Sequence, residues 1–191
     1  MNDWRDRLRE GLEPVLGLKD PRPKMSAYHN LPCAIFHYLP EDEFELRREM
    51  SLLSTRLNQK GKVVVRISLA ECLHEALAEQ APVEKLADAE RNLGVAVAVE
   101  TVHEVLASYC PLVDLVAKRM PKSPDPLRHI VFITRAGALF PVYRAFPLLE
   151  QLQGRIEVPT VLFYPGVLDG AAGLKFMGIL EPEHNYRPKI F

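Results

Sequence analysis

The sequence has few cysteines, and they form no recognisable metal-binding or disulfide pattern. Cys33, Cys72 and Cys110 are the only three in 191 residues, and no Cys-x-x-Cys pair occurs. An odd number of widely spaced cysteines argues against both a disulfide framework and a structural zinc site. We therefore expect three buried thiols in a reducing compartment.

Long apolar runs and an excess of one charge are also missing. No run reaches the roughly 18 apolar residues that a membrane span requires, and charges throughout the first ten residues leave no apolar core for a signal peptide. Lys and Arg total 24 against 25 acidic residues, for a net charge of −1. Free-standing nucleic-acid-binding proteins normally carry a clear excess of Lys and Arg. We expect a cytoplasmic protein without membrane association, in which the isolated chain does not bind nucleic acid directly.

Several catalytic and cofactor-binding strings are absent. The chain has neither the Walker A string Gly-x-x-x-x-Gly-Lys-Ser/Thr nor Gly-x-Gly-x-x-Gly. Its six histidines form no i, i+4 pair, and no serine sits in a Gly-x-Ser-x-Gly elbow. The residues therefore predict no cofactor, no metal and no catalytic residue, although a triad assembled in space leaves no such string.

What is present is an alternation of short apolar runs and amphipathic helices. The expected strands are Leu31–Tyr38, Val63–Val65, Ile130–Ile133 and Thr160–Tyr164, with the β-branched run at Val63 expected to be central. Their nearly continuous hydrophobicity is typical of a sheet covered on both faces, and intervening helices imply right-handed crossovers between parallel strands. We predict a single α/β domain over residues 1–191, with a mostly parallel sheet flanked by helices in a Rossmann-like three-layer arrangement, and an N-terminal helical segment at about residues 1–20.

Helical periodicity marks the segments between these strands. The expected helices are Asp3–Val15, Asp42–Asn58, a helix from Ser68 to about Ala78, Glu84–Met120 with a boundary at Pro111, and Leu139–Gln153. Ser68 and Glu71 have the spacing of a capping box, in which side-chain oxygen atoms accept hydrogen bonds from free backbone N–H groups.

The segment Thr134-Arg135-Ala136-Gly137 falls between a predicted strand and a predicted helix. Unpaired N–H groups at such a helix start can hold an anion, and Arg135 can add a charge-assisted contact. The alternative is structural, with Gly137 allowing a tight turn and Arg135 pairing with a carboxylate. The residues alone leave both interpretations open.

A second Gly-containing segment, Tyr164-Pro165-Gly166, is expected to form a flexible turn after the last buried strand. Asp169 follows it and is a candidate metal ligand or base. A lone carboxylate lacks the further ligands that Mg²⁺ or Zn²⁺ needs, and Asp-Gly is also a common turn dipeptide. The turn interpretation is the simpler one.

The ending His184–Phe191 combines aromatic, basic and apolar residues. An apolar terminus is usually held against something. It can pack on its own core as a last strand, dock on a partner, or contact phosphates through Arg187 and Lys189, although two cations give little affinity at cellular salt.

Several strings match one known family. They include Arg135-Ala136-Gly137-Ala138-Leu139-Phe140-Pro141, Val161-Leu162-Phe163-Tyr164-Pro165-Gly166, Phe176-Met177-Gly178 and Asn185-Tyr186-Arg187. In these strings and in their order, over nearly the whole chain, the sequence resembles the BrxB family, the small component of BREX bacteriophage-exclusion systems.

The resemblance implies a role in phage defence, in cells that mark their own DNA by adenine methylation. In such systems the methyltransferase PglX, the ATPase BrxC and PglZ, which resembles alkaline phosphatases, are separate chains, and BrxB proteins are associated with PglZ. The resemblance places no catalytic residue on this chain. It therefore implies a non-catalytic adaptor that binds PglZ, with PglX and BrxC as further candidate partners.

Two alternatives stay open beside the adaptor. One is a degenerate nucleotide- or anion-binding α/β protein with regulatory or weak hydrolytic activity, and the other is a DNA-contacting subunit of the complex. The candidate residues for partner or anion binding are Arg135, Gly137, Tyr143, Arg144, Asp169, His184, Asn185, Tyr186, Arg187 and Lys189.

Overall fold

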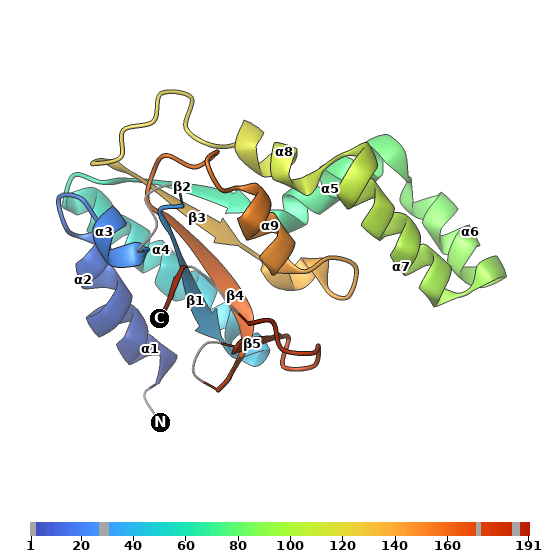
Figure 1. The fold of residues 1–191 in the computed structure, drawn as a ribbon, viewed down its shortest axis with the longest axis horizontal. Helices are drawn as coiled ribbons and strands as arrows, with labels where there is room; N and C mark the ends of the chain where they lie inside the picture. Colours follow the sequence, from blue (N-terminus) through green and yellow to red (C-terminus); the bar gives the residue numbers. More distant parts are fainter. Residues whose placement is uncertain (1–2, 27–30, 171–172, 185–187) are drawn as a thin grey trace.

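The protein is built on a central, mostly parallel β-sheet (Figure 1). The structure is a computed structural model that describes residues 3–26, 31–170, 173–184 and 188–191. Its strands are β1 (Cys33–Tyr38), β2 (Val63–Ser68), β3 (His129–Thr134), β4 (Thr160–Asp169), β5 (Gly173–Phe176) and β6 (Lys189–Ile190). Within these residues the order is β2-β3-β4-β1-β6, with all neighbours parallel, and β5 pairs antiparallel with β4. The predicted α/β fold with a mostly parallel sheet is confirmed.

One face of the sheet is covered by the N-terminal helices and a long helix. These elements are α1 (Trp4–Asp6), the π-helical η1 (Arg7–Leu12), α2 (Glu13–Leu16), α3 (Arg22–Met25) and α4 (Glu43–Gln59). Because side chains alternate along a strand, Phe36, Phe132 and Phe163 point to this face and form part of one apolar cluster. The rings of Phe36 and Phe132 lie 5.7 and 5.1 Å from that of Phe163.

The opposite face is covered by helices that follow β2 in the chain. They are α5 (Leu69–Gln80), the π-helical η3 (Val105–Tyr109), α8 (Leu112–Lys118) and α9 (Ala145–Gln151). Ile35, Val131 and Leu162, on the alternate strand positions, belong to this second apolar cluster. Helices on both faces explain why these strands are nearly continuous in hydrophobicity.

Two further helices project from this second layer. We call α6 (Val83–Leu93) and α7 (Val95–Glu104) together the arm, and Figure 1 shows it extending beyond the edge of the sheet. In α6, all of whose residues the structure describes, none is buried, and in α7 the one buried residue is Val102. The expected helical stretch from Glu84 to Met120 is therefore confirmed, but as separate pieces, with Pro111 as the N-cap of α8.

No single helix among the described residues has the length and apolar character to cross a membrane. The segments Val95–Tyr109 and Leu112–Lys118 meet that criterion only as a pair, which is bent by 53° at the break between them.

Two predictions from the sequence were wrong: the position of the Val63 strand in the sheet and the start of the Leu139 helix. The Val63 run is not central, because among the described strands β2 pairs only with β3 and forms one end of the sheet. The helix expected from Leu139 begins only at Ala145. A 3₁₀ turn, η4 (Ala136–Leu139), and an extended Phe140 before Pro141 come first, as expected for a residue that precedes proline.

The flexible turn expected at Pro165 and Gly166 is instead the middle of β4. The chain turns only after Asp169 and returns as β5. A Cβ atom at Gly166 would lie 2.3 Å from the Lys175 carbonyl oxygen. Glycine is therefore needed here because β5 approaches closely, and not because the chain bends.

The cysteines are free thiols, as predicted. Cys33 and Cys72 are buried, while Cys110 is only partly so. Burial raises the pKa of Cys33 to about 12 and that of Cys72 to about 11. Both are therefore protonated and poorly nucleophilic near neutral pH.

Candidate functional site

The carboxyl ends of β1 and β3 lie beside the middle of β4 at one edge of the sheet, and together they surround a crevice. Tyr38, the last residue of β1, lies opposite Pro165 of β4, and Arg135 directly follows β3. The crevice has a volume of about 330 Å³ and is lined by Pro40, Glu43, Phe44, Arg47, Arg135, Gly137, Ala138, Pro165 and Met177. We call these residues the carboxyl-edge crevice.

The topology of the sheet accounts for this position. The chain leaves β1 toward α4 on one face, and it leaves β3 toward α9 on the other face. Where neighbouring connections diverge to opposite faces of an open α/β sheet, a crevice forms outside the carboxyl ends of the strands, and ligands commonly bind there.

The backbone around the crevice adopts an unusual conformation at two positions. Arg135 has φ 59° and Met177 has φ 55°, and among the described residues they are the only non-glycine residues with positive φ. Residues other than glycine are sterically disfavoured at positive φ, and residues with this conformation cluster at functional sites. Both of these residues line the same crevice.

The crevice offers an exposed aromatic ring and a neutralised carboxylate. The Phe44 side chain is 73% exposed, and the Arg47 guanidinium lies 5.2 Å from its ring centroid. Arg47 Nε also donates to Glu43 Oε1 at 2.7 Å, while the Tyr38 hydroxyl donates to the other oxygen of that carboxylate. Burial, and then the charge of Glu43, raise the pKa of Tyr38, so its hydroxyl remains a donor.

Arg135 contributes a free positive charge to the same crevice. Its side chain is exposed and forms no hydrogen bond or ion pair with residues that the structure describes. At Gly137, an added Cβ would lie 3.4 Å from Met177 Sδ and 3.5 Å from Pro165 Cγ, which are ordinary packing distances. Gly137 thus forms part of the crevice wall next to Met177.

The anion interpretation of this segment required a helix start directly after Arg135. The structure places there the four-residue 3₁₀ turn η4, of which Arg135 is the N-cap. A single short turn supplies little of the aligned dipole that holds an anion at the start of an α-helix. The segment therefore presents the Arg135 cation beside an apolar wall, and not a row of free N–H groups that could bind a phosphate.

Tyr143 and Arg144 lie in a neighbouring groove and not in the crevice. Tyr143 is only 4% exposed, so most of its ring belongs to the core, and burial raises its pKa. Arg144 Nη1 donates to the Glu181 carbonyl oxygen at 3.2 Å and lies 3.7 Å from Glu183 Oε1. Arg144 thus holds the segment that follows β5.

Asp169 and His184 lie at the hairpin of β4 and β5. Asp169 Oδ1 forms an ion pair with Lys175 Nζ at 3.0 Å, and an added Cβ at Gly173 would come within 2.6 Å of the His184 ring. Across the part of the chain that the structure describes, no group of three His, Cys, Asp or Glu side chains is placed to hold a metal ion. Asp169 therefore links the two strands of the hairpin through its ion pair with Lys175.

The end of the chain packs on its own sheet, which confirms the self-packing alternative. Lys189 and Ile190 form β6 beside β1, and the Phe191 amide donates to the Ile35 carbonyl oxygen at 2.8 Å. Lys189 Nζ lies 4.3 Å from the centroid of the Phe191 ring. The candidates Asn185, Tyr186 and Arg187 lie outside the described residues.

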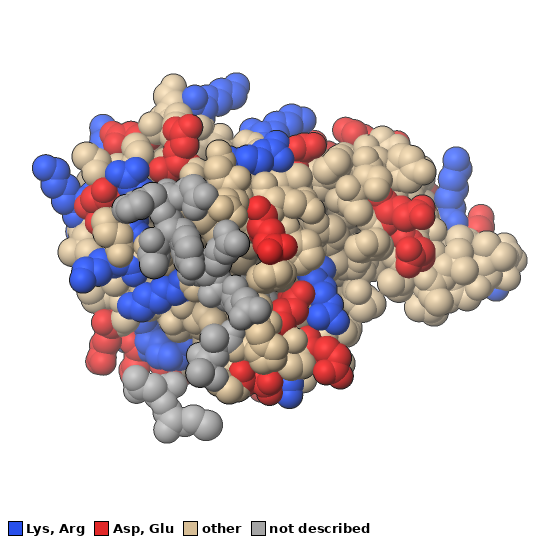
Figure 2. Space-filling view, in the orientation of Figure 1, with Lys and Arg blue, Asp and Glu red and all other residues tan. Residues whose placement is uncertain are grey.

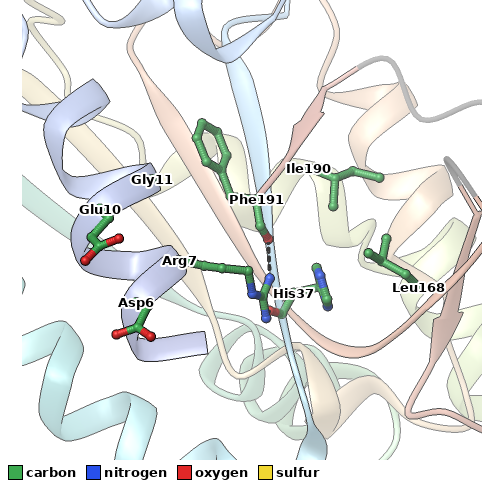
Figure 3. Close-up of a pocket in the computed structure, with 8 residues that line it drawn as sticks. All are labelled: Asp6, Arg7, Glu10, Gly11, His37, Leu168, Ile190 and Phe191. Carbon is green, nitrogen blue, oxygen red and sulfur yellow. Dashed lines mark hydrogen bonds between the residues drawn. The ribbon is translucent and has the colours of Figure 1, made fainter. Parts of the chain in front are cut away.

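A second cleft lies where this ending meets the N-terminal helix (Figure 3). Arg7 reaches across it, with Nη1 donating to the main-chain oxygen of Phe191 at 2.8 Å and Nη2 to that of His37 at 2.9 Å. The cleft has a volume of about 480 Å³, and Leu168 and Ile190 form part of its wall. Burial, and then the charge of Arg7, lower the pKa of His37 to about 4, so its imidazole is neutral at pH 7. We call this arrangement the Arg7 clamp.

Sequence reasoning found part of the crevice and missed the rest. It placed Arg135 and Gly137 at a strand end but missed Phe44, Arg47 and Met177. One signal was available, because Phe44 is an aromatic residue on the polar side of an amphipathic helix. The Arg7 clamp left no signal in the sequence, since its members meet only in the folded chain.

Comparison with known proteins settles the family. The family described as "BREX protein BrxB" matches residues 65–190. The chain belongs to the BrxB family. It is 29% identical over 155 residues to the "BREX protein BrxB" of Bacillus cereus (strain H3081.97), a match that covers 80% of this chain and 79% of that protein. No solved structure matches the chain.

This BrxB protein is therefore a component of a BREX phage-defence system. The family match begins inside β2 and includes the arm, β3, β4 and β5. From the crevice it covers Arg135, Gly137, Ala138, Pro165 and Met177. The contribution of α4 to the crevice lies before that match.

Proposed function

We propose that this BrxB protein is a non-catalytic, cytoplasmic adaptor that binds PglZ through the carboxyl-edge crevice. The observation that carries the proposal is the convergence of exposed Phe44, Met177 and the free Arg135 in one crevice. Aromatic residues, Met and Arg are the types enriched in protein–protein interfaces and among the residues that dominate their binding energy. The identity of PglZ as the partner rests on the resemblance to the BrxB family.

The chemistry of the crevice supports binding more than catalysis. Its carboxylate, Glu43, is engaged by Arg47 and by the Tyr38 hydroxyl, which leaves it poorly placed to take a proton from a substrate. Arg135 is the group in the crevice that is free to pair with a carboxylate of a partner. Arg135 and Met177 have positive φ, a conformation that persists only where the surrounding structure holds the backbone in place.

The test is binding of purified PglZ to BrxB variants. Arg135→Glu reverses the free charge, and Phe44→Ser removes the exposed ring, so each is expected to weaken binding by at least about tenfold. The matched control is Arg128→Glu, because Arg128 is also exposed but precedes β3 at the opposite edge of the sheet. The control is expected to bind PglZ like the wild type.

The outcomes separate this proposal from its rivals. Unchanged PglZ binding in soluble Arg135→Glu and Phe44→Ser variants contradicts the crevice assignment, and no binding by any variant or the wild type contradicts the adaptor. A rise in the melting temperature with nucleotides would favour a nucleotide-binding protein instead, because a ligand of the folded state stabilises it. A salt-dependent shift of duplex DNA would favour a DNA-contacting subunit.

A further inference from the structure

The end of the arm exposes an apolar surface that the fold itself does not use. Leu93, Val95 and Val97 are 66%, 61% and 39% exposed, and the whole run 93–97 is accessible. Gly94, with φ 92°, makes the connection between the two helices. On the face shown in Figure 2, the end of the arm is mostly uncharged surface.

This exposure is not required for the stability of the arm. The helices α6 and α7 pack against each other, and apolar side chains that face solvent at a projecting tip stabilise neither of them. Contiguous exposed apolar surface rimmed by polar residues is typical of interaction sites. The arm shares no residue with the carboxyl-edge crevice, so it is a separate surface.

The charge of the arm decides which partners fit. Residues 83–104 hold five acidic side chains and two basic ones, whereas the rest of the chain has 20 acidic and 22 basic residues. The acidic residues are Glu84, Asp88, Glu90, Glu100 and Glu104. One of the two cations, Arg91, is already paired with Asp88 at 3.0 Å.

The arm's net charge of −3 beside the apolar tip disfavours several occupants. It repels the phosphates of nucleic acid and the headgroups of anionic lipid. It also disfavours pairing of two arms from two copies of the chain, because like charges would then be brought together. It complements a surface in which lysine and arginine surround an apolar groove.

We propose that the arm is a second docking surface of this BrxB protein, and that its occupant is another protein component with an apolar groove rimmed by lysine and arginine. The side chains of Leu93, Val95 and Val97 enter the groove, and the acidic residues of α6 and α7 face the basic rim. Such charge complementarity speeds association and selects the partner. The proposal goes beyond binding of PglZ at the crevice and does not depend on it.

The experiment measures binding of BrxB to each of the other proteins of its own BREX system, purified separately and immobilised in turn. The triple variant Leu93→Ser/Val95→Ser/Val97→Ser is expected to bind one of them at least about tenfold more weakly than wild type. Because these side chains are exposed, the variant is expected to keep the wild-type melting temperature. The matched control is Leu52→Ser, an equally exposed apolar residue on α4.

A second variant tests the charge. Glu84→Gln/Glu90→Gln/Glu100→Gln removes three exposed carboxylates without touching the apolar tip. It is expected to slow association with the same protein severalfold and to reduce the loss of affinity between 0.1 and 0.5 M salt. An unchanged association rate and salt dependence would overturn the charge complementarity.

If every component binds the triple variant as tightly as wild type, the arm is not a docking surface. If the variant instead changes the sedimentation of BrxB alone, the occupant is a second copy and the proposal fails. If the weakened partner is PglZ while Arg135→Glu binds it normally, the arm proposal stands and the crevice assignment fails.

Discussion

The Arg7 clamp should hold the end of the chain to the N-terminal helix. Arg7→Met removes the guanidinium but keeps most of the aliphatic stem, so it deletes two hydrogen bonds and little packing. The lost bonds are those to the main-chain oxygens of His37 and Phe191, at 2.9 and 2.8 Å. The guanidinium also lies 5.3 Å from the centroid of the Phe36 ring.

The expected loss in the free energy of unfolding follows from the positive charge of the hydrogen-bond donor, Arg7. A hydrogen bond from a charged donor contributes about 1.5–3 kcal/mol to the free energy of unfolding. Arg7 is only half-buried, so two such bonds together correspond to a loss of roughly 3 kcal/mol after solvent screening. For a protein of this length that loss lowers the melting temperature by about 6–12 °C.

The matched control is Arg9→Met, two residues further along the same helix. Arg9 Nη2 pairs with Glu49 Oε1 at 2.7 Å, but its side chain is 57% exposed. Glu49 is only 14% exposed, but Arg56 Nη1 also lies 4.0 Å from its Oε2. A partly exposed ion pair of this kind contributes about 1 kcal/mol, so this variant should lose clearly less stability than Arg7→Met. Urea unfolding followed by circular dichroism measures the free energy of unfolding of all three proteins.

Hydrogen exchange at single amides distinguishes local release of the chain end from destabilisation of the whole fold. The Phe191 amide donates to the Ile35 carbonyl oxygen, and the His37 amide donates to the Phe191 oxygen at 3.2 Å. Hydrogen exchange at these two amides should speed up in Arg7→Met before the rest of the sheet opens. Equal destabilisation by Arg7→Met and Arg9→Met, or unchanged exchange at both amides, would refute the clamp.

Three further predictions concern stability. Burial, and then a neighbouring positive charge, lower the pKa of His37 from 6.5 to about 4. Between these two pH values the unfolded chain binds a proton at His37 and the folded chain does not, so the free energy of unfolding falls as the pH drops from 6.5 to 4. His37→Gln should flatten this part of the pH profile, measured by urea unfolding at several pH values. Gly166→Ala places a Cβ 2.3 Å from the Lys175 carbonyl oxygen, so the hairpin must shift, with a loss of about 1–3 kcal/mol in the free energy of unfolding; a wild-type value would disprove the close approach. The Ser68 hydroxyl accepts from the Glu71 amide at 3.3 Å, so Ser68→Ala should cost about 1 kcal/mol, and a neutral result in the same assay would remove this cap from the account of α5.

The candidate site was predictable only in part. Arg135 and Gly137 were found because a polar, Gly-containing segment after a buried strand falls at the carboxyl edge of a parallel sheet. Phe44 and Arg47 were missed because periodicity predicts the amphipathic helix α4 but does not show what its polar side faces. They reach the crevice because β1 pairs directly with β4 and brings the start of α4 beside the end of β3.

By itself the sequence determined the class of fold, the family and the self-packing tail as one of its alternatives. Strand and helix periodicity reflect burial of neighbouring side chains, and this local information also showed that the sheet is covered on both faces. Which strands pair is a contact between distant segments, so only the tertiary structure placed β2 at the end of the sheet and carried β4 straight through Gly166. The crevice, the Arg7 clamp and the exposed tip of the arm depend on such distant contacts, and periodicity along the chain does not record them.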